Sequence, residues 1–294
     1  MKLQVKEHRF TADSQVMIEQ VQRILASYEI ALTVRQVHYQ MVARQYYSNT
    51  VNNYRTISGL LTNARYAGLI DWDKIVDDTR AVFKTPSWDS IDQSVDNSIR
   101  TFRHDRWADN ENYVEVWVEK AALINVMYPT TNAFDVHITP CKGVNSTTAI
   151  WTAAERFMKH RDKDRTILYF GDFDPTGDWL HDDVLKRVRQ FVDIDVVRVA
   201  LNGDQVIEHN LPVAYEVLAK KNGKVYNKLE ADPRSRLFLE NHGELMQVEL
   251  DALDPAVLLE YLRNAIKEYI DLNKYTEWLD AEKEAKQEMQ ERTA

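Results

Sequence analysis

Apolar and polar positions in the N-terminal part of the chain recur with the period of an α-helix. Over residues 14–27 the apolar side chains fall on one stripe, which predicts an amphipathic helix. Thr33 and Gln36 have the spacing of a capping box, so we expect a second helix to begin here and to run to about Arg44. A third helix is predicted over 51–67, and short turns would join the three.

Short apolar runs come after the third predicted helix, at 69–73, 75–76 and 81–83. We expect them to form a small β wing. Three helices followed by a wing are typical of a winged helix-turn-helix domain of the α+β class, which we assign to residues 1–84. A helical protein-interaction module would show the same helical pattern and stays open as the alternative.

The periodicity changes after a polar, aspartate-rich stretch over 85–110, which we interpret as a connector. Beyond it, four apolar runs of strand length lie at 113–120, 134–140, 165–170 and 193–201. Helical stretches alternate with them, at 121–127, 146–159 and 178–191. This alternation predicts parallel βαβ units, so we expect a Rossmann-like α/β domain with a C-terminal extension over 111–275. A charged helical tail over 276–294 is expected to be solvated.

Composition limits the class of protein. A chain of 294 residues with 44% hydrophobic and 28% charged residues is expected to be globular, and no run approaches the length of a membrane span. The single cysteine, Cys141, excludes a disulfide framework and a multi-cysteine zinc site. The N-terminus lacks the apolar core of a signal peptide, so we expect a cytoplasmic, nucleoid-associated protein.

The net charge of −9 argues, taken alone, against a nucleic-acid partner, but the charge is spread unevenly. The first 100 residues hold 12 Lys/Arg against 11 Asp/Glu, and residues 31–70 hold four arginines and no acid. Such a locally positive surface is typical of phosphate contacts. The third predicted helix is also rich in side chains that suit base edges and phosphates. We therefore expect double-stranded DNA as the partner, bound by Arg35, Asn53, Arg55 and Arg65.

Two aspartates follow the third predicted strand of the α/β domain. Asp172 and Asp174 are two residues apart, so on an extended backbone both side chains point to the same face. Glu119 ends the first predicted strand and would reach the same rim, where the carboxyl ends of parallel strands meet. Three carboxylates suit Mg²⁺, with Mn²⁺ as a substitute. An acidic turn is the alternative. Lys120 could neutralise a phosphate or extend along the surface, and we expect the second.

The residues around these acids resemble a known family. Val-Glu-Lys at 118–120, together with Gly-Asp-Phe-Asp-Pro-Thr-Gly at 171–177, is similar to the signature of the Toprim domain. The form of the second motif resembles the topoisomerase VI A subunit and its relative, the meiotic double-strand-break transesterase. The resemblance covers about residues 10–205. In that family a winged-helix domain precedes the Toprim domain, in the order predicted here.

The nucleophile of that family is a tyrosine four residues after an arginine. In Val34–Tyr39 (Val-Arg-Gln-Val-His-Tyr), Arg35 and Tyr39 match the motif, whereas Gln36 and His38 depart from the usual acid and aromatic residue. The resemblance implies that Tyr39 attacks a DNA phosphodiester and forms a transient 5′-phosphotyrosyl link. A tyrosine has an ordinary pKa near 10, so a cation must assist it, and Arg35 is the candidate.

The resemblance also implies a cofactor and partners. Mg²⁺ held by Glu119, Asp172 and Asp174 would bind the scissile phosphate, which counts Glu119 among the catalytic residues. In the family the tyrosine of one subunit works with the metal of the other, so a homodimer is implied. A separate ATPase subunit is a further partner to be tested.

Three functions are compatible with these residues. The first is a topoisomerase VI A-like DNA transesterase. The second is a Toprim endonuclease in which metal-activated water cleaves DNA and Tyr39 only packs in the core. The third is a DNA-binding regulatory protein with an inactive Toprim site, and the intact acids count against it. Protein attached to the cleaved DNA ends would distinguish the first function from the second.

Overall fold

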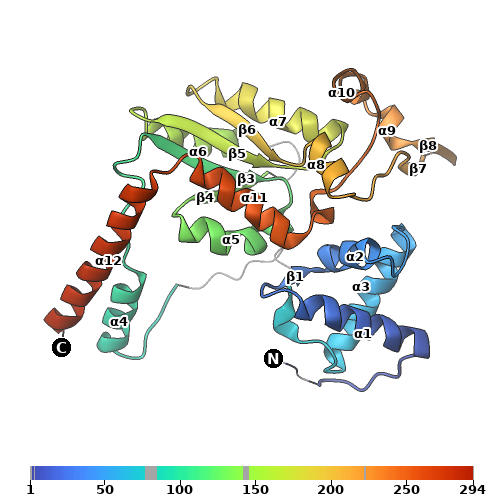
Figure 1. Cartoon of the computed structure of the whole chain (residues 1–294), viewed down its shortest axis with the longest axis horizontal. Coiled ribbons are helices and arrows are strands. Elements are labelled where there is room, and N and C mark those ends of the chain that lie inside the picture. Colours follow the sequence, from blue (N-terminus) through green and yellow to red (C-terminus); the bar gives the residue numbers. More distant parts are fainter. Residues whose placement is uncertain (1, 3, 77–84, 142–145, 222, 294) are drawn as a thin grey trace.

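Helices cover both faces of a parallel sheet, and a separate group of helices from the N-terminal residues lies beside it (Figure 1). The computed structural model describes residues 2, 4–76, 85–141, 146–221 and 223–293. Among these residues, no helix is long and apolar enough to cross a membrane. The architecture confirms the predicted α/β class, at the level of a mixed fold with a parallel sheet.

Three helices form the N-terminal part of the chain, which we call the helical module (residues 4–76). They are α1 (Ala12–Ala26), α2 (Val34–Ala43) and α3 (Val51–Tyr66). Their apolar stripes meet in one core, in which Ile24 and Leu61 are fully buried. The predicted capping box begins α2, because Gln36 N donates to Thr33 Oγ1 (3.1 Å) and Thr33 N donates to Gln36 Oε1 (2.9 Å).

The predicted wing is not confirmed. The short elements near it are the strands β1 (Leu32–Thr33) and β2 (Ile75–Val76) and the 3₁₀ helix η1 (Trp72–Lys74). Residues 69–73 are not a strand, because Asp71 accepts from Asp73 N (3.0 Å) and starts the 3₁₀ helix. β2 pairs in parallel with β1, and the third predicted run, 81–83, lies outside the described residues.

The stretch predicted as a connector, 85–110, contains the helix α4 (Ile91–Thr101). This helix packs along α12 (Leu272–Thr293), the last helix of the chain (Figure 1). The charged tail is helical as predicted but is not wholly solvated, because Glu282 is buried. Its carboxylate accepts two hydrogen bonds of 2.8 Å from the guanidinium of Arg106, which is also buried. This ion pair fastens the tail to the stretch that follows α4.

A four-stranded parallel sheet forms the centre of the larger domain. Its strands are β3 (Asn112–Val118), β4 (His137–Pro140), β5 (Asp164–Phe170) and β6 (Asp195–Ala200). They lie in the order β4-β3-β5-β6, and each begins and ends within three residues of its predicted range. β3 and β5 are the two central strands, and seven residue pairs join them. The predicted parallel sheet is therefore confirmed.

Four helices cover the sheet, two on each face. They are α5 (Ile124–Ala133), α6 (Thr147–Met158), α7 (Pro175–Val188) and α11 (Pro255–Lys267), and the short 3₁₀ helix η2 (Ala121–Leu123) precedes α5. On the face of α6 and α7, Phe157 and Leu180 are buried with Tyr169 of β5. On the face of α5 and α11, Leu262 is buried with Phe170.

Short elements fill the region between β6 and α11, for which the sequence pattern predicted none. They are α8 (Gly203–Glu208), β7 (Leu218–Lys221), β8 (Lys224–Asn227), α9 (Lys228–Ala231), α10 (Ser235–His242) and the 3₁₀ helix η3 (Leu250–Ala252). η3 lies against α2 and so joins the helical module to the sheet domain.

Candidate functional site

The order of the strands marks one point at the edge of the sheet. The chain goes from β3 outward to β4 on one side, and then returns to β5 on the other side of β3. Ligands of open parallel sheets bind where the connections diverge in this way. Glu119 follows β3 and Asp172 follows β5, and Asp172 N donates to Glu119 Oε2 (3.0 Å). The structure therefore brings these two sequence-predicted acids together.

Asp172 is buried and is neutralised by a lysine. Its Oδ2 lies 2.7 Å from Lys120 Nζ, and its Oδ1 accepts from Leu250 N (2.9 Å). The expectation that Lys120 extends along the surface is wrong, because its ammonium group points into the acids, where Glu249 Oε2 is a further 3.6 Å partner. Burial opposes the charge of Lys120, but Asp172 and Glu249 outweigh it and raise the pKa of Lys120.

Asp174 has a structural role in addition to its place at the rim. It is the N-cap of α7, with Oδ1 accepting from Gly177 N (2.7 Å), while Oδ2 accepts from Gln247 Nε2 (2.9 Å). Gly177 is needed here because a Cβ at this position would lie 2.2 Å from the backbone oxygen of Asp172. The Asp-Pro-Thr-Gly sequence therefore turns the chain tightly from β5 into α7 and holds both aspartates in place.

A segment far along the chain completes the cluster of acids at the carboxyl ends of the strands, which we call the acid rim. Phe173 and Val248 form an antiparallel bridge, with hydrogen bonds of 2.9 and 3.0 Å. Val248 and Leu250 are buried in the core, and the residues that alternate with them carry polar side chains to the rim. These polar residues are Gln247, Glu249 and Asp251. They lie outside the three metal-binding acids expected from the sequence, although the polar–apolar alternation over 247–251 is visible in the sequence.

Asp251 is the acid least satisfied by the protein itself. It is 3% exposed, and its Oδ1 has no hydrogen-bond partner among the described residues. Burial raises the pKa of Asp251 to about 6, against the opposing effect of Lys120 and Arg35. Burial also raises the pKa of Glu119 to about 7, and the charge of Asp172 adds to the effect. The acids of the rim thus carry more negative charge than the neighbouring cationic side chains neutralise.

Two residues of α2 reach this rim from the helical module. Arg35 forms an ion pair with Glu249 and lies 5.4 Å above the ring of Tyr54. Tyr39 is 8% exposed and belongs to the hydrophobic cluster of the sheet domain, which includes Leu250, and not to the core of its own module. Burial and then Glu249 raise the pKa of Tyr39, whereas Arg35 lowers it. Tyr39 therefore lies beside the acids of its own chain.

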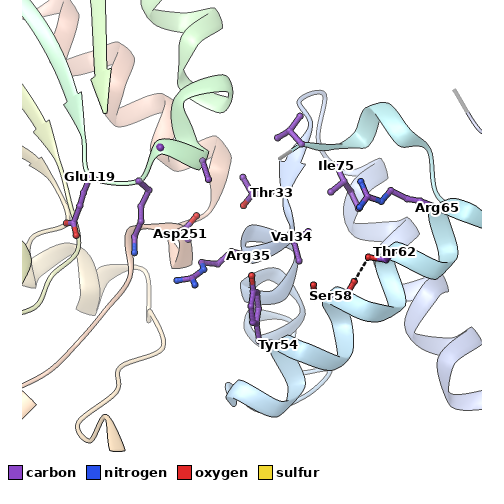
Figure 2. A pocket seen from close by; sticks show the side chains of 14 residues that line it. Thr33, Val34, Arg35, Tyr54, Ser58, Thr62, Arg65, Ile75, Glu119 and Asp251 are labelled. Carbon is purple, nitrogen blue, oxygen red and sulfur yellow. Dashed lines mark hydrogen bonds between the residues drawn. The ribbon is translucent and has the colours of Figure 1, made fainter. Parts of the chain in front are cut away.

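A cleft of about 510 Å³ separates the acids from α3 (Figure 2). Glu119, Lys120 and Asp251 line it on one side. The α3 side is formed by residues spaced three or four apart: Tyr54, Ser58, Thr62 and Arg65. Arg35 lies between the two sides (Figure 2).

Of the four sequence-predicted DNA-binding residues, only Arg35 and Arg65 line this cleft. Asn53 does not, because its Nδ2 donates to Ser48 O (2.8 Å) at the start of α3. Arg55 is exposed on a different face of the helix. The sequence identified the helix but not the face of it that meets the acids.

The described residues contain no group of three or more His, Cys, Asp or Glu arranged to hold a metal ion. Asp172 and Asp174 are engaged instead by Lys120, Gln247 and backbone N–H groups. The chemistry of the rim nevertheless fits a divalent cation. All its ligands are hard oxygens, the acids are buried together, and Asp251 presents an unpartnered oxygen.

The crowded acids predict how stability depends on pH in the metal-free protein. The pKa of Asp251 is raised from 3.8 to about 6 in the folded state, so the folded protein favours the protonated carboxyl group. The contribution of Asp251 to the free energy of unfolding is therefore fully present below pH 4 and is lost as the pH rises through 6. In EDTA, Asp251→Asn should therefore raise the melting temperature by roughly 5 °C at pH 8. The gain should shrink toward pH 4.5.

Thermal unfolding of both proteins between pH 4.5 and 8 would measure this difference. Asp193→Asn, which changes an exposed aspartate before β6, serves as the matched control. An equal effect of Asp251→Asn at all pH values would contradict the prediction, since a loss of packing alone does not titrate.

Comparison with known proteins adds no assignment, because neither a protein-family model nor a curated protein matches the chain. The function must therefore be argued from the rim itself. Its chemistry is that of buried carboxylates beside Arg35 and Lys120, at the strand ends where parallel sheets bind ligands.

Proposed function

We propose that this protein is a Mg²⁺- or Mn²⁺-dependent enzyme that cleaves DNA strands at the cleft between α3 and the acid rim. The observation that carries the proposal is the convergence of buried acids at the strand-order switch point, where Glu119 accepts from Asp172 N, Lys120 contacts Asp172, and the buried Asp251 is close enough for Asp172 and Lys120 to affect its pKa. Buried acids at such a point are costly unless a cation compensates them. A divalent cation held by these acids would also bind a phosphate of the DNA, and this would give the arrangement a catalytic use.

Glu119 and Asp172 would hold the metal ion, with Asp174 and Asp251 on either side of them. When bound, a divalent ion supplies charge stabilisation at the scissile phosphate and lowers the pKa of bound water. The protein's own contribution is positive charge nearby. Lys120 and Arg35 now neutralise Asp172 and Glu249, and a metal at the acids would release both cations to bind DNA phosphates.

The α3 wall supports DNA as the substrate. Ser58 presents a hydroxyl group that can donate to a phosphate oxygen, and Arg65 adds a positive charge, whereas the hydroxyl of Thr62 donates to Ser58 O (3.0 Å). Tyr54 offers a ring face for stacking at the end of the cleft nearest Arg35. No acid comes from the helical module to line this wall, so it is complementary to a polyanion.

Hydrolysis by water is the form of cleavage that this arrangement supports best. Tyr39 is 8% exposed, and burial raises its pKa, so its hydroxyl is poorly placed to ionise and attack. Transesterification by Tyr39 is the second candidate. It is favoured by the position of Tyr39 beside the acids and by Arg35 one helical turn away. It requires α2 to move off η3 so that the hydroxyl reaches a phosphate.

The two forms predict different DNA ends. Supercoiled plasmid would be incubated with protein and Mg²⁺ or Mn²⁺, stopped with SDS and separated with and without proteinase K. Hydrolysis predicts free ends from both wild type and Tyr39→Phe, with rates within about threefold, since the tyrosine hydroxyl would take no part. EDTA should abolish cleavage by both.

Tyr46→Phe, which removes an exposed hydroxyl in the loop after α2, is the matched control. Ends that enter the gel only after proteolysis, and that disappear in Tyr39→Phe but not in Tyr46→Phe, would replace hydrolysis by transesterification. Absence of any metal-dependent cleavage by wild type would reject both forms.

A further inference from the structure

The hairpin of β7 and β8 stands apart from the rest of the molecule. Its two strands pair only with each other and form a two-stranded sheet separate from the central sheet. Figure 1 shows it at the edge of the molecule, beyond α9. An isolated two-stranded hairpin is marginally stable in water, so a hairpin that projects in this way is suited to a partner surface.

The charge of the hairpin is opposite to that of the chain. Residues 217–229 contain four lysines and no acid, whereas the whole chain carries −9. The lysines are Lys220, Lys221, Lys224 and Lys228. Tyr226 is 37% exposed and lies two residues from Lys224, so both share one face of the ribbon. A basic ribbon with an exposed aromatic ring is complementary to a nucleic acid, whose phosphates the lysines can contact and whose bases can stack on the ring.

The base of the hairpin is tied to the acid rim. Val217 and Lys228 line a second cleft, of about 340 Å³, together with the rim residues Asp174, Gln247 and Glu249. Thr176, in the first turn of α7, donates to Asp232 just after α9 (3.2 Å). Different acids of the rim therefore line two clefts: Glu119 and Asp251 line the one walled by α3, and Asp174 and Glu249 line the one at the base of the hairpin.

We propose that the β7–β8 hairpin is an arm that binds the phosphates of duplex DNA and holds it at the second cleft. This inference rests on the proposed function, in which the acids cleave the same DNA. Four residues of strand extend about 13 Å at 3.4 Å per residue. One DNA strand carries a phosphate about every 3.4 Å of helix axis, so the arm spans about four phosphates.

The test measures binding separately from cleavage. A fluorescein-labelled 30-base-pair duplex of mixed sequence would be titrated with the full chain in EDTA, and its anisotropy followed between 50 and 200 mM salt. Lys221→Gln with Lys224→Gln, at two directly paired positions on the face of Tyr226, should weaken binding about tenfold at the lowest salt. It should also reduce the slope of log K against log salt by about two, because each phosphate contact contributes about 0.9.

The matched control is Lys159→Gln with Lys283→Gln. It removes two exposed lysines, at the end of α6 and on α12, away from both clefts. It should leave affinity and slope unchanged. Equal affinity and slope in the hairpin variant and wild type would overturn the inference, and so would failure of wild type to bind the duplex. If the hairpin substitutions instead dissociate a dimer in size-exclusion chromatography without changing DNA affinity, the arm is a subunit contact.

The two proposals fail in different ways. Hairpin-dependent DNA binding without metal-dependent cleavage would reject the proposed function and keep the arm. If the hairpin variant instead binds DNA as wild type does and cleaves it at the wild-type rate at low DNA concentration, that result would reject the proposed arm and leave the proposed cleavage activity intact.

Discussion

Asp172→Asn is expected to lower the rate of metal-dependent DNA cleavage by about 10²- to 10³-fold, the usual effect of removing one charged group from a preorganised site. Asp172 lies at the centre of the rim, where it contacts Lys120 and its Oδ1 accepts one hydrogen bond, from Leu250 N of the segment that carries Glu249. Asparagine keeps the acceptor for Leu250 N but removes the charge. The fold should therefore survive while the metal ligand is lost.

Initial rates of plasmid nicking with saturating DNA would measure the effect, and thermal unfolding in EDTA would show that the variant is folded. Asp195→Asn is the matched control, since this exposed residue begins β6 at the opposite edge of the same sheet. Duplex binding in EDTA should be the same for both variants. Equal nicking rates for both variants would mean that the acid rim is not the site of cleavage.

The second large effect concerns stability. Glu115→Ala should lower the free energy of unfolding by about 3 kcal/mol, because it leaves the partly buried guanidinium of Arg156 and the buried indole N–H of Trp117 without their acceptor. Glu115 is fully buried on β3, where its carboxylate accepts from Arg156 (2.6 and 2.7 Å) and from Trp117 Nε1 (3.0 Å). Tyr113 donates a further hydrogen bond of 3.1 Å. Such a loss is a large share of the stability of most domains.

Urea denaturation followed by circular dichroism would measure this change, with Glu284→Ala on the exposed face of α12 as the control. Restoring neutrality in the double variant Glu115→Ala with Arg156→Ala should recover part of the loss. A loss below about 1 kcal/mol for Glu115→Ala would show that the network contributes little.

Patterns within single segments of the sequence were sufficient to predict the helices and strands that carry the acid rim. The capping box of Thr33 predicted the start of α2, and the alternation of strands and helices predicted the parallel sheet. Because parallel strands end at one edge, the positions of Glu119 and Asp172 followed from the sequence as well. These inferences need only spacing along a single element and one rule of topology.

Contacts between distant segments could not be predicted in this way. α4 was not predicted, and although the tail was expected to be helical, nothing in the sequence showed that α12 packs against α4. The segment of Glu249 reaches the rim through a bridge to Phe173, which is 75 or more residues away in the chain. The direction of the Lys120 side chain could not be predicted either, since its partners Asp172 and Glu249 come from segments distant in the chain.

The position of Tyr39 makes the boundary near residue 84 a poor place to divide the protein. The ring of Tyr39 packs in the hydrophobic cluster of the sheet domain. A fragment that begins after the helical module would therefore expose this part of the cluster to water. A helical module from another protein could replace the native one only if it carried an aromatic ring at the position of Tyr39 and a positively charged side chain opposite Glu249. The helical module and the sheet domain are therefore matched surfaces, and η3 belongs to the contact between them.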